Sequence, residues 1–206
     1  AAVHSWTLGL IFVMVPGLLW FYSSSYKRLF LIGNLIISLA AGLTPLTIAI
    51  ANIGYMNRLY GSIMQWMPVA HDLYLWLGGF ALFAFLCTWI RETIKDLQDQ
   101  MGDRELECHT MPIVIGETWT KVFITVLTLA TMALIAVAHW CWLPFPTIWH
   151  SLATRFVVFG LLVPFACDIW LLWAAKIPSD YKTAQNVMKF IMFIGTMFSF
   201  VVLKLL

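Results

Sequence analysis

Carboxylate side chains are concentrated in one short segment of this chain. Seven of the ten acidic residues among its 206 residues lie between Glu92 and Glu117. Four of them follow one another at intervals of four, three and four: Glu92, Asp96, Asp99 and Asp103. On a helix this spacing places them on one face, where like charges repel by roughly 0.2–0.5 kcal/mol per pair unless a cation offsets them. A row of oxygen ligands suits Mg²⁺, which proteins usually share with substrate phosphates, so this acidic face is a candidate magnesium site.

Basic residues are interleaved with these acids and allow two interpretations. Arg91, Lys95 and Arg104 could hold the phosphate oxygens of a substrate directly. Alternatively, Arg91 and Lys95 pair with Glu92 and Asp99 in a solvated, salt-bridged helix end at a membrane surface, which adds little stability. The spacing alone leaves both interpretations open.

Two further groups of polar residues are candidates for substrate contact. The segment 22–28 reads YSSSYKR, and its adjacent Lys27 and Arg28 are either topological anchors or partners for an anionic headgroup or diphosphate. Asp168 is the one acid well inside an apolar run, where a carboxylate is costly and marks a cavity or a polar path. The alternative for Asp168 is a structural side chain, protonated or hydrogen-bonded, that faces the interior of a helix bundle.

The composition determines which elements must carry these side chains. Hydrophobic residues make up 62% of the chain and charged residues only 11%, and the mean hydropathy is +0.87. A soluble globule of this size could not bury so much apolar surface, since soluble domains carry roughly 25% charged residues. The composition excludes a soluble enzyme, a disordered chain and a nucleic-acid-binding domain, and it predicts an integral membrane protein.

Six apolar runs are long enough to be transmembrane helices, which need roughly 20 residues. They cover Trp6–Tyr22, Leu29–Ile53, His71–Ile90, Val122–His139, Phe156–Ala175 and Thr183–Leu203. None alternates polar with apolar residues as membrane barrel strands do. We therefore expect an all-α integral membrane fold, with residues 1–206 forming a single transmembrane helical domain.

The distribution of basic residues predicts the orientation of these helices. The connections after the first, third and fifth runs carry most of the cations, namely Lys27, Arg28, Arg91, Lys95, Arg104, Lys121, Lys176 and Lys182. The opposite side carries Arg58, Arg155 and Lys204. The positive-inside rule places the acidic segment in the cytoplasm. We expect the third run to continue there as a helix that ends near Gly102.

Two segments resemble motifs of the UbiA-type membrane prenyltransferases. The stretch 91–103, RETIKDLQDQMGD, followed by TMPI at 110–113 and by Gly116, resembles the family's second aspartate-rich motif, in the form closest to the geranylgeranylglyceryl-phosphate-type branch. The stretch 22–28, with Gly33 and Asn34 after it, is similar to the family's Y-S-x-x-x-K-R…G-N segment.

The resemblance implies a bundle of nine transmembrane helices around a central cavity. The six runs would be the last six of these helices, so the chain would be an N-terminally truncated portion, the C-terminal two-thirds of such an enzyme. The family's first motif, N-x-x-x-D-x-x-x-D, is not found in these residues, because no acid precedes Lys27. We therefore expect half of the magnesium–diphosphate site to be missing, and this chain to be inactive alone.

The resemblance also implies a reaction. It is the Mg²⁺-dependent transfer of a polyprenyl group, such as geranylgeranyl, from its diphosphate to a lipophilic or prenylglyceryl-phosphate acceptor, with loss of pyrophosphate. Asp96, Asp99 and Asp103 would be the catalytic metal ligands. The substrate-binding candidates are Tyr22, Lys27, Arg28, Arg91, Lys95, Arg104 and Asp168. Donor, acceptor and membrane lipid are the expected partners, in a bacterial or archaeal cell membrane.

Two other classes of function remain open at this point. An ion-coupled transporter subunit would use the acids as a cation vestibule and Asp168 as part of the path, although transporters usually show polar or broken helices near the midplane. A non-catalytic membrane scaffold would need neither. The sequence leaves the acceptor, the prenyl chain length and the oligomeric state unspecified.

Overall fold

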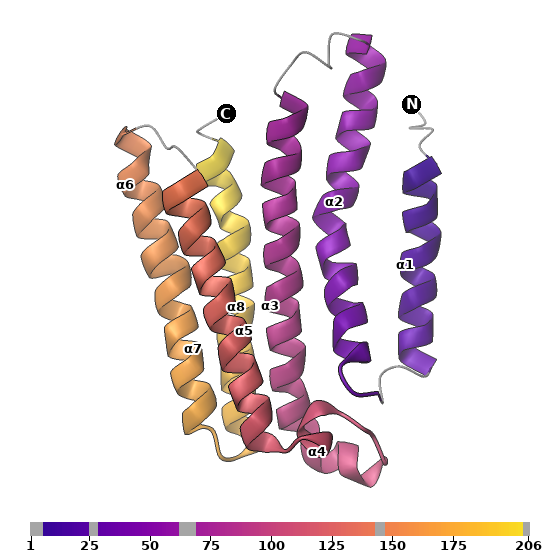
Figure 1. Ribbon diagram of the computed structural model, residues 1–206, viewed down its shortest axis with the longest axis vertical. Helices are drawn as coiled ribbons and strands as arrows, with labels where there is room; N and C mark the ends of the chain where they lie inside the picture. The colour runs from indigo at the N-terminus through magenta and orange to yellow at the C-terminus, as the bar shows by residue number, and fades with distance from the viewer. Residues whose placement is uncertain (1–5, 25–28, 62–68, 143–146, 204–206) are drawn as a thin grey trace. The chain divides into compact units, whose positions relative to one another are not determined.

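The described part of the chain is helical throughout and has no strand (Figure 1). A computed structural model describes residues 6–24, 29–61, 69–142 and 147–203. The elements are α1 (Trp6–Ser24), α2 (Ile32–Tyr60), α3 (Val69–Glu105), α4 (Met111–Val114), α5 (Glu117–Val137), η3 (Ala138–Trp142), α6 (Thr147–Arg155), η4 (Phe156–Leu162), α7 (Val163–Ala174) and α8 (Pro178–Leu203). The elements η3 and η4 are π-helical. The predicted all-α class is confirmed.

Five stretches in the described residues are long and apolar enough to cross a membrane. They are Ile32–Tyr60, His71–Glu105, Glu117–Cys141, Ser151–Ala174 and Pro178–Leu203. The first predicted run is also helical, but its apolar stretch, Leu8–Tyr22, is shorter. Large apolar side chains remain exposed along the spans, for example Trp170 and Phe159 at 70% each, as expected of surfaces that face lipid.

Helix α3 is longer than a membrane is thick. Its 37 residues span about 55 Å at 1.5 Å per residue, against a hydrocarbon core of about 30 Å. The apolar part, residues 69–90, already accounts for that thickness, so the charged remainder projects beyond it. The continuation predicted from the sequence is confirmed. Gly102 lies near the end of the helix, as expected, and the helix runs three residues further to Glu105. The left-handed residue that follows is Glu107 (φ 52°).

The chain divides into two compact units. The first contains α1, α2 and α3 as far as Thr88, and the second contains residues 28–31 and 89–206. The single-domain organisation expected from the sequence therefore stays a prediction. In the first unit α1 packs against α2. Helix α2 also approaches α3 closely at Gly42, where an added Cβ would lie 3.0 Å from the Ala81 carbonyl oxygen and 3.1 Å from the Phe85 Cβ.

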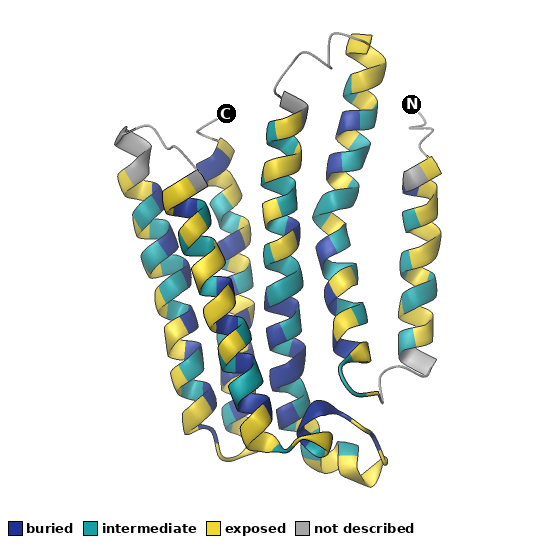
Figure 2. Cartoon of the chain, in the orientation of Figure 1, coloured by how far each residue is buried: buried dark blue, intermediate teal, exposed yellow. Residues whose placement is uncertain are grey.

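The second unit is built on the packing of α7 against α8 and α5. Its fully buried side chains include Phe165 and Leu172 of α7, Ile124 of α5, and Met188 and Ile191 of α8. Figure 2 shows buried, half-buried and exposed positions alternating along each of these helices. Residues 89–105 of α3 belong to this unit.

Gly42 tests the close approach of α2 to α3. We expect Gly42→Ala to lower stability by about 1–3 kcal/mol, because the new methyl group meets backbone that cannot move aside. Gly79→Ala on α3 is the matched control, since nothing lies within 4 Å of its added Cβ and Ala is the better helix former by ~1 kcal/mol. Thermal unfolding in detergent measures both. Equal loss in the two variants would contradict the close packing.

Candidate functional site

The acidic residues of α3 form one face, as their spacing predicted. At about 100° per residue the carboxylates of Glu92, Asp96, Asp99 and Asp103 fall within an arc of about 60°. Asp99 is exposed, Asp96 and Asp103 are half-buried, and Glu92 is buried. Because Glu92 lies nearest the apolar part of the helix, the face runs from a buried end to a solvent-accessible one.

Glu92 forms ion pairs with two neighbouring basic side chains. The Arg91 guanidinium donates a hydrogen bond to Glu92 Oε1, and Lys95 Nζ lies 3.9 Å from Glu92 Oε2. This confirms half of the salt-bridge interpretation, with Glu92 as the shared partner of both bases. An isolated buried carboxylate would be costly, so the two cations are held beside it. Asp96, Asp99 and Asp103 are the other carboxylates of the acidic face.

The three aspartates suit a cation that takes only part of its ligands from protein. Among the described residues no group of three His, Cys, Asp or Glu side chains converges as a metal cage. Side chains three and four positions apart along a helix form a row on one face. Mg²⁺ commonly binds one or two carboxylates and completes its shell with waters and substrate phosphates, so this oxygen donor set fits it.

The second predicted cluster is only partly described. Tyr22 lies in α1 and is half-buried, whereas Lys27 and Arg28 fall outside the described residues. Tyr22 also belongs to the first unit and the aspartates to the second. The expected proximity of this cluster to the acidic face stays a prediction.

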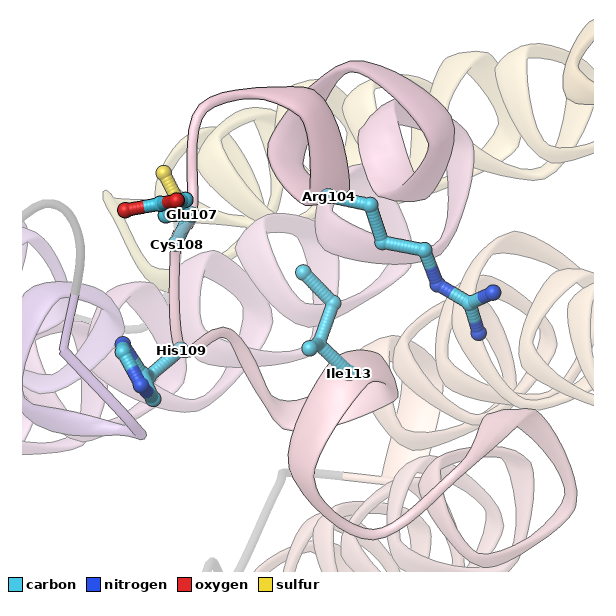
Figure 3. A pocket seen from close by; sticks show the side chains of 5 residues that line it. All are labelled: Arg104, Glu107, Cys108, His109 and Ile113. Atoms are coloured by element: carbon cyan, nitrogen blue, oxygen red, sulfur yellow. The ribbon is translucent and has the colours of Figure 1, made fainter.

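Arg104 lies at an open pocket after the end of α3. The pocket measures about 340 Å³ and is lined by Arg104, Glu107, Cys108, His109 and Ile113. Figure 3 shows the Arg104 side chain pointing away from those of Glu107 and His109. These polar groups do not converge on one point, so the pocket is not a ligand site by itself. Arg104 remains available to an anion at the exposed end of α3.

Asp168 is buried in the second unit with an oxygen that has no partner. Its residue is 1% exposed and lies on the buried stripe of α7 with Phe165 and Leu172. Its Oδ1 makes no hydrogen bond in the described structure. The inward orientation that both interpretations required is thus present. A hydrogen-bonded structural role finds no support at Oδ1, and an orphaned buried acceptor of this kind calls for an explanation.

One polar cluster was not predicted from the sequence. Lys121 Nζ on α5 donates to the Ala175 carbonyl oxygen at 2.9 Å and lies 2.9 Å from Glu117 Oε1. The Tyr181 hydroxyl donates to the same carboxylate oxygen at 2.6 Å, and its ring centroid lies 5.2 Å from Lys121 Nζ. The cluster joins the start of α5 to the α7–α8 connection. Only the i,i+4 pair Glu117–Lys121 could have been found from spacing.

A second contact missed from the sequence joins α3 to α8. Gln185 Nε2 donates a hydrogen bond to Gln98 Oε1 at 2.8 Å, and Gln185 is buried. Neither glutamine carries charge or belongs to a periodic polar pattern, so no signal in the sequence indicated the pair.

Comparisons with known proteins agree on one family. The model of the UbiA prenyltransferase family matches residues 1–197. Digeranylgeranylglyceryl phosphate synthase of Methanosphaera stadtmanae is 25% identical over 197 residues, covering 94% of this chain and 60% of that protein. The enzyme of the same name from Methanopyrus kandleri is 30% identical over 180 residues, covering 86% and 56%. Somaliensene A/B synthase of Streptomyces somaliensis is 32% identical over 113 residues, covering 54% and 35%.

The chain therefore spans about 60% of the length of the first of these relatives. No solved structure matches it.

The cluster around Lys121 gives a prediction about stability. We expect Lys121→Met to cost about 1–3 kcal/mol, because the Ala175 carbonyl and the Glu117 carboxylate both lose a donor. Lys182→Met changes an exposed lysine beside Tyr181 and should stay within about 0.5 kcal/mol of wild type. The measurement is thermal unfolding in detergent. Matching midpoints for the two variants would show that the cluster does not hold α5 to the α7–α8 connection.

Proposed function

Because the chain belongs to the UbiA prenyltransferase family, we propose that the complete gene product transfers a polyprenyl group from its diphosphate to an acceptor and releases pyrophosphate. The observation that supports this proposal most directly is the acidic face at the charged end of α3. Asp96, Asp99 and Asp103 lie there in one row, next to a helix length that lipid can cover. A substrate with an anionic head and an apolar tail needs both environments.

The proposed roles follow from what each side chain can do. Asp96, Asp99 and Asp103 would hold a divalent cation, Mg²⁺ in our proposal, through single carboxylate oxygens. When bound, the cation supplies charge neutralisation to the leaving diphosphate. Arg91 and Lys95 are kept beside these acids by Glu92 and add positive charge. Arg104 is exposed one residue beyond Asp103 and can reach a phosphate oxygen.

The same residues account for the chemistry of the transfer. The bond between the prenyl C1 and the diphosphate oxygen breaks, and the electron pair leaves with pyrophosphate. The arginine and lysine side chains meet the charge that develops on the leaving group. The acceptor oxygen then bonds to C1 and releases its proton. The apolar helices keep water from this carbon, and the aromatic rings of the chain are suited to stabilise positive charge on it.

We further propose a geranylgeranyl donor and a prenylglyceryl-phosphate acceptor. Two of the relatives that cover most of this chain are named digeranylgeranylglyceryl phosphate synthases. Tyr22, Lys27, Arg28 and Asp168 complete the proposed substrate contacts. We place the acidic end of α3 in the cytoplasm of a bacterial or archaeal cell, because the cations gather on that side.

An ion-coupled transporter is the second candidate, and one observation favours it. The unpartnered Oδ1 of Asp168 is what a polar path inside a membrane protein would show. A membrane scaffold has no comparable support. Measuring pyrophosphate release in the complete gene product separates these functions.

The first test removes the charge of single aspartates. In nanodiscs with Mg²⁺ and geranylgeranyl diphosphate, we expect Asp99→Asn and Asp103→Asn each to reduce pyrophosphate release by more than about 100-fold. Even the outer partners of metal ligands cost 10–100-fold when they are removed. Glu105→Gln is the matched control, because it removes one charge from an exposed position of the same helix outside the acidic arc. It should leave the rate unchanged.

Two results would contradict the proposal. Wild-type protein that releases no pyrophosphate from any polyprenyl diphosphate would shift the assignment to a transporter or a scaffold. An equal effect of Glu105→Gln and Asp99→Asn would reduce the role of the acidic face to its net charge.

Substitution of Asp168 distinguishes a substrate-binding role of this side chain from a purely structural one. We expect Asp168→Leu to unfold at the same temperature as wild type or higher, because an unpartnered buried acceptor costs about 1–3 kcal/mol. The same variant should lose about tenfold or more in kcat/KM for the acceptor, since a hydrogen bond to a charged group is worth ~1.5–3 kcal/mol. Unfolding and steady-state kinetics are measured on one preparation. A lower midpoint with unchanged kcat/KM would assign Asp168 a structural role.

A further inference from the structure

The hydrogen bond between Gln185 and Gln98 is attached to the same turn of α3 as the aspartates. Gln98 lies one residue before Asp99 and two after Asp96. Its Oε1 accepts from Gln185 Nε2 of α8 at 2.8 Å across 87 positions of sequence. Gln185 is 7% exposed, so little water competes for its amide. A buried hydrogen bond of this kind is stronger than one in water and is costly to leave unmade.

The helix geometry shows what this contact fixes. Counting about 100° per residue from Gln98, the buried residues Ile90, Ile94 and Leu97 fall between about 260° and 320°. Gln100 lies at about 200°, at the opposite edge of that buried arc. Its side-chain amide donates a hydrogen bond to the Pro112 carbonyl oxygen of α4 at 3.4 Å.

Residues 89–105 of α3 are therefore held at both edges of their buried arc, by the hydrogen bonds of Gln98 and Gln100. The acidic residues occupy the remaining arc, from about 100° to 160°. The two glutamine contacts fix the rotation of α3 about its own axis, and this rotation sets the direction in which the carboxylates point.

A small rotation would matter for a metal site. A carboxylate lies about 5–6 Å from the helix axis, so a turn of about 20° moves it by roughly 2 Å. Mg²⁺ requires ligand distances close to 2.0–2.1 Å and tolerates little deviation. Without the contacts of Gln98 and Gln100, α3 could rotate, and the aspartate oxygens would move away from the positions that a bound cation requires.

We infer that Gln185 is a positioning residue of the proposed reaction, which orients Asp96, Asp99 and Asp103 by holding Gln98. This inference rests on the proposed function and deepens it. Gln185 touches neither the cation nor the substrate, and its effect passes through the rotation of α3. The neighbouring Asn186 has no such role, because it is exposed and accepts a hydrogen bond from Lys189 of its own helix at 3.2 Å.

Gln185→Leu tests the inference with two readouts in the complete gene product. Pyrophosphate release gives kcat and KM, and the binding of Mn²⁺ with inorganic pyrophosphate, followed by electron paramagnetic resonance, gives metal affinity without turnover. We expect kcat and Mn²⁺ affinity each to fall about 10–100-fold, the range for outer partners of metal ligands. The thermal midpoint should fall only modestly, because leucine fills the buried site and water can reach the half-buried Gln98 amide. Asn186→Leu is the matched control and should change none of these quantities.

An exchange of the pair distinguishes positioning from a general loss of packing. Gln98→Glu and Gln185→Lys should each weaken Mn²⁺ binding and turnover when made alone. Together they replace the amide contact by an ion pair, and we expect the double variant to recover to within about threefold of wild type. Such recovery is an interaction energy between two residues in contact, which independent effects do not produce.

Three outcomes would overturn the inference. The first is wild-type turnover and Mn²⁺ affinity in Gln185→Leu, alongside inactive aspartate variants, and this would leave the proposed function intact. The second is strict addition of the two single losses in the exchange variant. The third is wild-type protein without turnover, which would overturn the proposed function itself and this inference with it.

Discussion

Placing carboxylates in hydrocarbon is costly, and this cost shapes the helix that carries the acidic face. Four acids at helical spacing cannot remain inside a bilayer, and the helix that carries them cannot stop at the membrane surface. Helix α3 satisfies both conditions by its length of 37 residues. Its apolar part is covered by lipid or protein, and its charged part projects as a continuation of the same rigid rod. The acidic face is therefore carried on a helix and not on a loop, which fixes the order and spacing of its oxygens.

Residues 89–105 of α3 are attached to the neighbouring helices by hydrogen bonds of neutral amides. Glu92 pairs locally with both Arg91 and Lys95. The contacts with α8 and α4 are made by the amides of Gln98 and Gln100. This division has a physical advantage, because amide contacts do not compete electrostatically with a cation on the acidic face. The cluster of Lys121, Glu117 and Tyr181 has a similar role at the start of α5.

Asp168 departs from this pattern of satisfied groups. Buried polar atoms in folded proteins nearly always have a partner, and the other large buried groups of α7, Phe165 and Leu172, are apolar. A carboxylate oxygen with no partner lowers stability and persists where function requires it or where a further group supplies the bond. In our proposal, Asp168 and the row of aspartates belong to one membrane site that has an apolar and an anionic part.

Four features could be predicted from the sequence: the helical class, the apolar runs, the continuation of α3 and the common face of its acids. These follow from periodicity and from the cost of charge in lipid, which are local properties of the chain. Tertiary structure decided that Glu92 is a buried partner of two cations, that α3 ends at Glu105, and that Lys121 reaches the Ala175 carbonyl. It also decided that Gln98 meets Gln185 across 87 positions. Such contacts depend on which faces of distant helices meet, and neutral amides have no periodic signature, so only the packed chain could show them.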